Sequence, residues 1–348
     1  MNLTFISVVL RNTFDVTMLS VICPIYNEEK YIARCIESII QQDYPKEDLE
    51  VLFVDGMSTD RTREIIMGYA AQHPYLKVLD NPQKIVPCAM NIGIRQAKGD
   101  IIMRLDGHAY YPDNYFSEIV RWHSVLPEAW NVGGVCDTKV ANSNPVSEAI
   151  AKVMSDKFGV GDSTFRTGSD KEYLEVDTVP FGCYKSFVFD KIGLYNEKLV
   201  RVQDIELNKR LAHAGGKILM VPSIHCTYIP RDNYKDFYKN RFQTGYWVVK
   251  SCFITHTTKN LGLRHFVPAC FVLALLLSWV LGFIWWPLFF TPLLVASLYL
   301  GCMLVRSFQI RDEKTTVWSL LRAFCCIHFS YGLGSLKALL DGLFKKGL

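Results

Sequence analysis

The sequence lacks the cysteine spacing that would indicate disulfide bonds or a structural zinc site. Its eleven cysteines are odd in number, none stands in a CxxC pair, and most lie in apolar runs such as Val21-Ile22-Cys23. Small buried cysteines of this kind are typical of a reducing compartment. The pattern argues against a disulfide framework, and no zinc site is expected.

Runs of like charge are also absent. The net charge is +4 and no cluster of Lys and Arg occurs, so nothing indicates nucleic-acid binding. From Phe266 to Val305 no residue is charged at all, whereas the chain before it has the composition of an ordinary globular domain. We therefore expect one globular domain over residues 18–262 and a membrane-associated region over 263–348.

The first residues make a poor signal peptide. The apolar run from Phe5 to Leu10 is short and has no basic residue before it. We predict an N-terminal extension over residues 1–17, with Met18 as an alternative start.

After this extension, apolar runs alternate with helical patterns. Helices are predicted from Asn27, over 61–72 and over 87–97, between strands at 19–24 (stopped by Pro24), 49–54, 76–79 and 101–105. This alternation predicts an α/β fold with an open, mostly parallel sheet. Ligands bind such sheets at the carboxyl ends of the strands, where Pro24, Asp55 and Asp106 lie.

The segment Arg104-Leu105-Asp106-Gly107-His108 ends the fourth of these strands. Side chains alternate along extended chain, so Asp106 and His108 point to the same side. A carboxylate and an imidazole in this arrangement suit a divalent cation that also holds phosphates. A turn whose Asp and His only satisfy backbone groups is an equal alternative.

Five short motifs in a fixed order resemble the signatures of family 2 glycosyltransferases with a GT-A fold, which is Rossmann-like. No single motif is specific, and the resemblance covers roughly residues 19–247. The subgroup it most resembles is membrane-attached, with succinoglycan-type exopolysaccharide transferases as its examples. The motifs are Val21 to Glu28, Val54 to Asp60, Asn91-Ile92-Gly93, Leu105 to His108, and Val202 to Leu211 with Ala214 to Ile218.

The resemblance implies a site for a nucleoside-diphosphate sugar. Asp55 would accept a hydrogen bond from the base, most often uracil, and the following glycine would let a flat ring approach. Pro24, Tyr26, Glu28 and Asp106 would line the same pocket. Two plainer alternatives stay open: Asp55 caps a turn, and Glu28 is a solvated carboxylate at a helix start.

The resemblance also implies a metal site at Asp106 and His108. Mg²⁺ or Mn²⁺ bridging both phosphates would stabilise the departing nucleoside diphosphate. The family's second ligand is usually a carboxylate, and His108 in its place favours the softer Mn²⁺. Met90 is a second departure, since many relatives carry Arg near the diphosphate.

Asp204 is the predicted catalytic base. Inverting sugar transfer needs a carboxylate that takes the proton of the acceptor hydroxyl, and the start of a helix keeps Asp204 ionised. An N-cap without catalytic role is the alternative. The resemblance places the acceptor at Gly182, Gln203, Tyr246 and Trp247. Tyr246 and Trp247 lie in a segment that matches an element of processive enzymes only loosely. This weak match favours addition of a single sugar.

The uncharged region predicts membrane helices at 267–286 and 288–305, joined at Trp285-Trp286-Pro287. Arg264 before this hairpin and Arg306 after it predict that both ends are cytoplasmic. Residues 317–344 contain charges and are predicted as an amphipathic, interfacial or re-entrant helix, or a third crossing. This placement at the inner (plasma) membrane implies a saccharide on a polyprenyl diphosphate as acceptor, in cell-surface polysaccharide biosynthesis.

Two other functions compete with this interpretation. A nucleotidyltransferase would need a glycine-rich, basic phosphate loop after the first strand, where this chain has Pro24-Ile25-Tyr26-Asn27-Glu28. A catalytically inactive membrane scaffold with the same fold is the other alternative. Asp55, Asp106 and Asp204 count against it, whereas Met90, His108 and Gln203 count for it.

Overall fold

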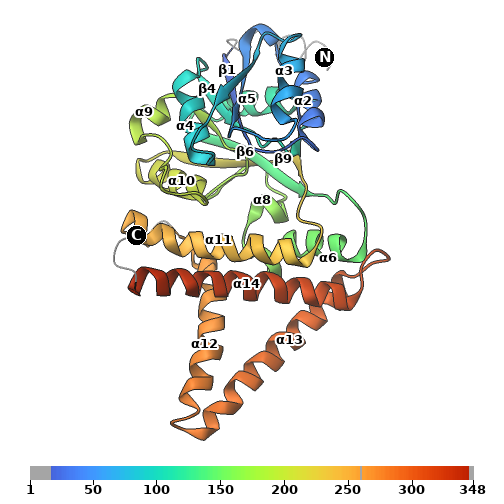
Figure 1. Cartoon of the computed structure of the whole chain (residues 1–348), viewed down its shortest axis with the longest axis vertical. Helices are drawn as coiled ribbons and strands as arrows, with labels where there is room; N and C mark the ends of the chain where they lie inside the picture. Colours follow the sequence, from blue (N-terminus) through green and yellow to red (C-terminus); the bar gives the residue numbers. More distant parts are fainter. Residues whose placement is uncertain (1–16, 259–260, 345–348) are drawn as a thin grey trace, which may run out of the picture. The chain divides into compact units, whose positions relative to one another are not determined.

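The computed structural model describes residues 17–258 and 261–344, which fall into two units (Figure 1). The first unit contains the residues up to Cys136, Gly168–Glu197 and Leu207–Tyr228. The second contains Asp137–Thr167, Lys198–Glu206 and the chain from Ile229 onward. The predicted extension over 1–16 and the basic pair Lys345-Lys346 lie outside the described residues.

A nine-stranded sheet organises the first unit, with the order β3-β2-β1-β4-β8-β6-β9-β5 and with β7 paired to β9. The strands β3, β2, β1 and β4 are parallel, and β8 runs antiparallel to β4 and β6. The predicted parallel arrangement is confirmed for this half. The strands are β1 Leu19–Ile25, β2 Leu49–Asp55, β3 Leu76–Asp80, β4 Ile101–Arg104, β5 Ala109–Tyr110, β6 Ala129–Thr138, β7 Leu174–Glu175, β8 Cys183–Lys185 and β9 Lys217–Tyr228.

The prediction that Pro24 stops the first strand is wrong, because β1 continues to Ile25. Pro24 is paired with Val54 of β2, whereas the pairing of β1 with β4 ends at Ile22. Pro24 therefore has a neighbouring strand on one side only, a position at which a missing backbone donor is tolerated.

Helices connect and cover these strands. Gly93 of α4 lies so close to β1 that an added Cβ would be 2.5 Å from Ile22 Cγ2. Helix α2 begins at Ile32, not at Asn27 as predicted, since Asn27 has a left-handed φ of 55°. The helices of this unit are α2 Ile32–Ile40, η1 Lys46–Asp48, α3 Thr62–Ala70, α4 Val86–Gln96, α5 Tyr115–Val125, α9 Phe187–Ile192 and most of α10 Gln203–His213.

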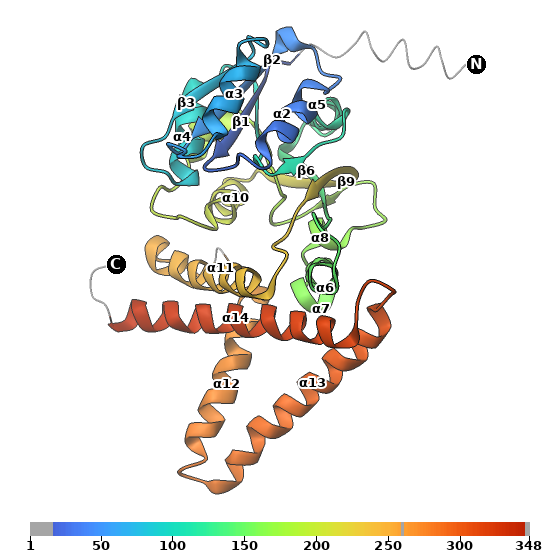
Figure 2. The ribbon, with the colours of Figure 1, turned by 45° about the vertical axis from the view of Figure 1, so that its right-hand side comes forward.

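The second unit is helical. Its longest helices, α11 (Tyr234–Thr255) and α14 (Val317–Phe344), lie side by side in both ribbon views (Figure 2). Glycines make this contact close: an added Cβ at Gly245 or at Gly334 would be 2.1 Å from a carbonyl oxygen of the opposite helix. The remaining elements are α6 Pro145–Met154, α7 Lys157–Val160, α8 Thr164–Thr167, η2 Leu263–His265, α12 Val267–Leu281, η3 Trp286–Phe289 and α13 Phe290–Ile310.

The predicted helical hairpin is formed by α12 and α13, which project away from α11 and α14 (Figure 2). Its limits differ from the prediction. Helix α12 ends at Leu281, because Gly282 packs against Phe289 and Pro287 follows, and α13 continues to Ile310. At 15 residues α12 is about 22 Å long, which is short of a bilayer core of about 30 Å.

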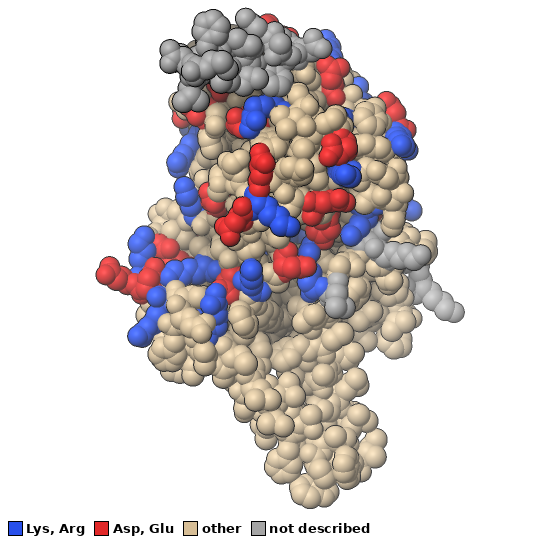
Figure 3. Space-filling model, turned by 180° about the vertical axis from the view of Figure 1, so that it is seen from behind, with Lys and Arg blue, Asp and Glu red and all other residues tan. Residues whose placement is uncertain are grey.

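Among residues 17–258 and 261–344, two helices are long and apolar enough to cross a membrane, namely Trp286–Ile310 and Val317–Phe344. The first is almost entirely exposed, and the second is partly covered by the other helices. Figure 3 shows that the projecting hairpin carries no charged side chain on the face in view, whereas Lys, Arg, Asp and Glu are frequent elsewhere on that face. This contrast fits an apolar hairpin that inserts into lipid.

Candidate active site

The turns after β1 and β2 are bonded to each other. The Asn27 amide donates to Ser58 Oγ at 3.0 Å, and Asn27 Oδ1 accepts from the Thr59 amide at 2.8 Å. The Arg61 amide donates to Glu29 Oε2 at 3.1 Å. Asn27 has a positive φ, and so does Met57 at 60°. These contacts fix the carboxyl ends of two neighbouring parallel strands as one surface, the place where such sheets bind ligands.

Asp55 supports this surface from below. Its side chain is fully buried, and its Oδ1 accepts from the Ser58 amide at 3.0 Å and from Ser58 Oγ at 2.6 Å. Its Oδ2 accepts from Arg63 Nη1 at 3.2 Å, and Arg63 also pairs with Asp80 at 2.6 Å. The sequence predicted a contact from Asp55 to a base. The structure shows a carboxylate without exposed surface that caps the turn, which was the alternative.

Tyr26 is the predicted nucleotide-site residue with the most exposed side chain, at 44%. Its ring lies against Gly56, where an added Cβ would be 3.2 Å from Tyr26 Cδ2. Lys84 Nζ is 5.9 Å from the centre of the same ring. Sequence reasoning missed Lys84, although a basic residue in the Asn81-Pro82 turn after β3 is a readable signal. Pro24 is half-buried beneath this surface.

Asp106 lies in the turn after β4 with 22% of its side chain exposed. Its Oδ1 accepts from Arg104 Nε at 3.1 Å and Nη2 at 2.9 Å. Burial opposes ionisation, but the positive charge of Arg104, with a contribution from His108, lowers the pKa of Asp106 below its ordinary value. Within the described chain, Oδ2 accepts no hydrogen bond, so an ionised oxygen remains for a ligand.

His108 and Glu28 form a pair beside Asp106. His108 Nδ1 is 2.9 Å from Glu28 Oε1, and both side chains are partly buried. The Glu28 amide donates to Thr62 Oγ1 at 2.7 Å, which holds the pair in place. A carboxylate on one ring nitrogen is the usual means of orienting a metal-binding histidine.

These residues fit a divalent cation that is shared with a ligand. Among residues 17–258 and 261–344, no group of three or more His, Cys, Asp or Glu side chains could hold a metal by itself. Mg²⁺ and Mn²⁺ bound to nucleotides need only one or two protein ligands, since phosphates and water supply the others. The free oxygen of Asp106 and the oriented His108 match that requirement. Met90 is buried in α4, so its side chain is not available to contact a diphosphate.

The glycine predicted for acceptor binding is covered by protein. An added Cβ at Gly182 would be 2.9 Å from Asn131 Oδ1 and from Tyr184 Oη. These two side chains occupy the space beside Gly182, and the approach of a sugar ring to this residue stays a prediction. Tyr184 Oη and Asn131 Nδ2 both donate to Asn208 Oδ1, at 2.9 and 3.0 Å. The buried amide of Asn208 thereby fixes α10 on the sheet.

Asp204 lies in the first turn of α10, one turn before Asn208, and belongs to the second unit. Its Oδ1 accepts from the Ile205 amide at 2.9 Å, and its side chain is half-buried. Val202, just before the helix, has a left-handed φ of 58°, a strained conformation for a β-branched residue. Such strain is found most often at functional sites. Gln203 is 5% exposed.

Tyr246 and Trp247 lie on α11, also in the second unit. Tyr246 Oη donates to Asp341 Oδ2 of α14 at 3.1 Å. Lys250 Nζ is 5.5 Å from the Tyr246 ring centre and 4.7 Å from that of Trp247. The first unit thus brings together Pro24, Tyr26, Glu28, Asp55, Asp106 and His108. Five predicted residues remain: Gly182 lies beneath Tyr184, and Gln203, Asp204, Tyr246 and Trp247 belong to the second unit.

The parallel strands, the joined turns and the partly exposed carboxylate define an α/β protein with a candidate ligand site at the carboxyl ends of its strands. The chain belongs to glycosyl transferase family 2. The model of that family matches residues 20–167. The dolichyl N-acetyl-alpha-D-glucosaminyl phosphate 3-beta-D-2,3-diacetamido-2,3-dideoxy-beta-D-glucuronosyltransferase of Methanococcus voltae is 32% identical over 234 residues, which cover 65% of this chain and 71% of that protein.

The succinoglycan biosynthesis protein ExoA of Rhizobium meliloti is 30% identical over 250 residues, 71% of this chain and 73% of the relative. Among solved structures, a mannosyltransferase from Pyrobaculum calidifontis, in complex with GDP-Man and Mn²⁺, has a TM-score of 0.56 at 18% identity. The match covers 96% of this chain and 89% of that one. It supports the GT-A fold, and the relatives show that the protein is a glycosyltransferase.

Proposed function

We propose that the protein is an inverting glycosyltransferase that moves one sugar from a UDP-sugar to a saccharide on a polyprenyl diphosphate. The observation that carries the proposal is the arrangement of Asp106, which keeps an ionised oxygen available beside the His108–Glu28 pair. Such a site holds a diphosphate through a divalent cation. The exposed Tyr26 and Lys84 lie on the same surface and would contact the nucleotide.

Mn²⁺ or Mg²⁺ would be held by Asp106 and His108 and would supply positive charge to the departing diphosphate. The protein's own contribution is positioning. Glu28 orients the imidazole, Arg104 keeps Asp106 ionised, and Asp55 with Ser58 holds the turn that presents Tyr26. We assign Asp55 this positioning role.

Asp204 would be the base. The acceptor hydroxyl loses its proton to the Asp204 carboxylate as its oxygen bonds to the anomeric carbon. The bond from that carbon to the diphosphate oxygen breaks on the opposite face, and the nucleoside diphosphate leaves with the electron pair. A carboxylate in the first turn of a helix is favoured in its ionised form. Gln203, Tyr246 and Trp247 would contribute to the acceptor side.

A lipid-linked acceptor is supported by two observations. The hairpin of α12 and α13 exposes large apolar side chains along its length. The names of the two relatives refer to a dolichyl-phosphate sugar and to succinoglycan, a polysaccharide. We therefore place the enzyme at the cytoplasmic face of the plasma membrane, in the synthesis of a surface polysaccharide.

The test is donor turnover by the full chain in detergent, with a panel of nucleotide sugars and with or without Mn²⁺. We expect metal-dependent release of UDP from one donor and its loss in Asp106→Asn and Asp204→Asn. Asp113→Asn is the matched control, because Asp113 is exposed. Asp204→Asn should still bind the donor, whereas Asp106→Asn should lose the part of donor binding that depends on the metal.

Donor binding, measured on the same samples, separates the alternatives. Release of pyrophosphate from a nucleoside triphosphate would indicate a nucleotidyltransferase. Absence of binding to every nucleotide sugar would indicate an inactive scaffold. Release of a different nucleoside diphosphate would overturn only the assignment of UDP.

A further inference from the structure

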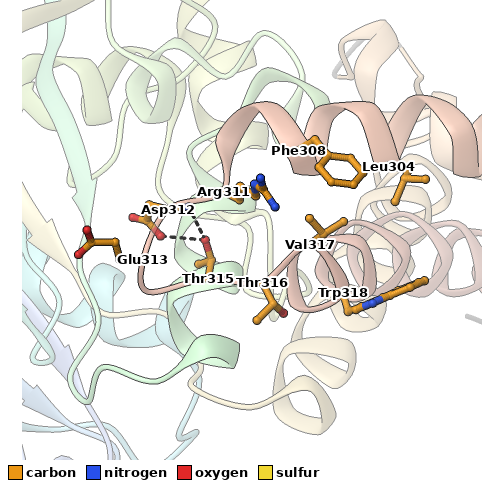
Figure 4. Close-up of a pocket in the computed structure, with 9 residues that line it drawn as sticks. All are labelled: Leu304, Phe308, Arg311, Asp312, Glu313, Thr315, Thr316, Val317 and Trp318. Atoms are coloured by element: carbon orange, nitrogen blue, oxygen red, sulfur yellow. Dashed lines mark hydrogen bonds between the residues drawn. The ribbon is translucent and has the colours of Figure 1, made fainter.

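A pocket lies at the bend between α13 and α14. We call it the elbow pocket, and its volume is about 870 Å³, within the usual size range of small-molecule sites. It belongs entirely to the second unit. The residues that line it are Leu304, Phe308, Arg311, Asp312, Glu313, Thr315, Thr316, Val317 and Trp318 (Figure 4).

The lining is divided by polarity. Figure 4 shows Leu304, Phe308, Val317 and Trp318 together on one side, with Arg311 between them and the acidic residues. The side chains of Asp312 and Glu313 point to the other side, away from Phe308. The pocket therefore has an apolar wall with a cation at its edge.

Arg311 is not neutralised by a carboxylate. Its guanidinium lies 5.3 Å from the centre of the Phe308 ring, and within the described chain it forms no ion pair or hydrogen bond. The neighbouring charges do have partners. Arg306 pairs with Asp156 at 2.6 Å, and Lys314 lies 3.7 Å from Glu148.

Asp312, the acid nearest to Arg311 in sequence, is bound elsewhere. Its Oδ2 pairs with Lys152 Nζ at 2.8 Å, and its Oδ1 accepts from Thr315 Oγ1 at 2.8 Å. The hydrogen bond from Lys152 is the main cause that lowers the pKa of Asp312 to about 2, and that from Thr315 is the second. Asp312 is therefore ionised and paired with Lys152 at neutral pH. Arg311 is thus left as a cation that can receive an anion.

The place of the pocket along the chain indicates what that anion is attached to. No residue from Phe266 to Val305 is charged, and then Arg306, Arg311, Asp312, Glu313 and Lys314 follow within a short stretch. The pocket begins at Leu304, so it lies at the transition from the apolar hairpin to the charged surface. Trp318 is 70% exposed there, and exposed tryptophan is enriched at membrane interfaces.

A ligand suited to this pocket is anionic at one end and apolar at the other. We propose that the elbow pocket binds one anionic phospholipid of the surrounding membrane, with its phosphate on Arg311 and an acyl chain along Leu304, Phe308 and Trp318. The proposal depends on membrane attachment and not on the sugar or the acceptor. It assigns a ligand to a part of the chain outside the candidate active site.

The test is lipid binding to the full chain in detergent, followed by native mass spectrometry. Phosphatidylglycerol is titrated against phosphatidylcholine of the same acyl chains. We expect one phosphatidylglycerol to bind preferentially and Arg311→Gln to weaken it roughly tenfold, the effect of losing one charge-assisted contact. Lys314→Gln is the matched control, because it removes an equal charge from the same turn outside the pocket lining.

A second variant tests the apolar wall. Leu304→Trp narrows the pocket at its apolar wall while Arg311 is kept, and it should also weaken retention of the lipid. Binding of the nucleotide sugar on the same samples shows that each variant is folded. In addition, phosphatidylglycerol should raise the melting temperature of the wild type and not that of Arg311→Gln.

Four results would overturn the proposal. Equal weakening by Lys314→Gln would show general surface attraction, and unchanged binding by Leu304→Trp would place the lipid elsewhere. Displacement of the lipid by inorganic phosphate at a similar concentration would show that no acyl chain is recognised. Preferential binding of a polyprenyl diphosphate would instead identify the pocket as part of the acceptor site.

Discussion

The turns after β2 and β4 both begin near an aspartate, but the two carboxylates have different surroundings. Asp55 has no exposed side-chain surface, and both of its oxygens accept hydrogen bonds, from Ser58 and Arg63. The side chain of Asp106 is 22% exposed, and Arg104 contacts only its Oδ1. The first carboxylate is used within the protein, whereas the second retains the capacity to bind a ligand.

This difference separates stability from function at one edge of a sheet. A buried carboxylate with satisfied oxygens holds the backbone around it and is costly to remove. A carboxylate with an unused ionised oxygen contributes less to folding and more to binding. Substitutions of the two residues should therefore have opposite effects on activity and stability.

The largest effect is expected for Asp106→Asn. Loss of the anionic ligand should lower kcat by at least about 100-fold, the effect of removing one preorganised electrostatic contact. The free energy of unfolding should change by only about 1 kcal/mol, because the pair with Arg104 is partly exposed. Donor turnover and urea denaturation measure the two quantities. If the variant lost turnover because it unfolds, Asp106 would have a structural role like that of Asp55, and the difference between the two aspartates would be contradicted.

Asp55→Asn should have the reverse effect. The amide cannot pair with Arg63, so we expect the free energy of unfolding to fall by about 2–3 kcal/mol. The folded enzyme should keep most of its kcat, measured below the unfolding transition. Loss of donor affinity with unchanged stability would instead support the direct contact with a base that the sequence predicted. Arg63→Gln, which leaves Asp55 its bonds to Ser58, should destabilise by less.

The parallel half of the sheet was predictable because its signals are local. Each strand from β1 to β3 is a separate run rich in apolar residues and is followed by a helical pattern, and β2 and β3 each end in an aspartate. The antiparallel half was not predicted in this way. β5 and β7 are two residues long, β8 is three, and β8 pairs with β4 across a large separation in sequence.

The site was predictable in its residues but not in their partners. Asp55 and Asp106 look alike in sequence, since each follows an apolar strand and precedes a glycine. Only the position of Arg63, and its second contact with Asp80 on the neighbouring strand, shows that Asp55 is occupied. The surroundings of Gly182 could not be seen in the sequence either, because one of the side chains beside it, Asn131, comes from a distant strand.

The role of the Asp106 carboxylate can also be tested through the pH dependence of kcat. The lowered pKa means that Asp106 contributes stability at neutral pH and loses it as the pH falls through that value. In Arg104→Gln, burial would remain without the opposing charge, so the pKa should rise. The acid limb of kcat against pH should therefore move to higher pH. An unchanged limb would show that another group controls it, and Arg121→Gln, which removes an arginine that pairs with Glu118 away from Asp106, is the control.

The smallest effect is expected at Lys84, on the same surface but without a bonded carboxylate. Its Nζ lies 5.9 Å from the ring of Tyr26, and its φ of 59° shows that the turn after β3 is held in an unusual conformation. One exposed charge near a diphosphate contributes under about 1 kcal/mol. Lys84→Gln should therefore raise the KM for the nucleotide sugar about threefold and leave kcat unchanged. Lys98→Gln, at the amino end of β4, is the control, and an equal rise in its KM would show a general charge effect.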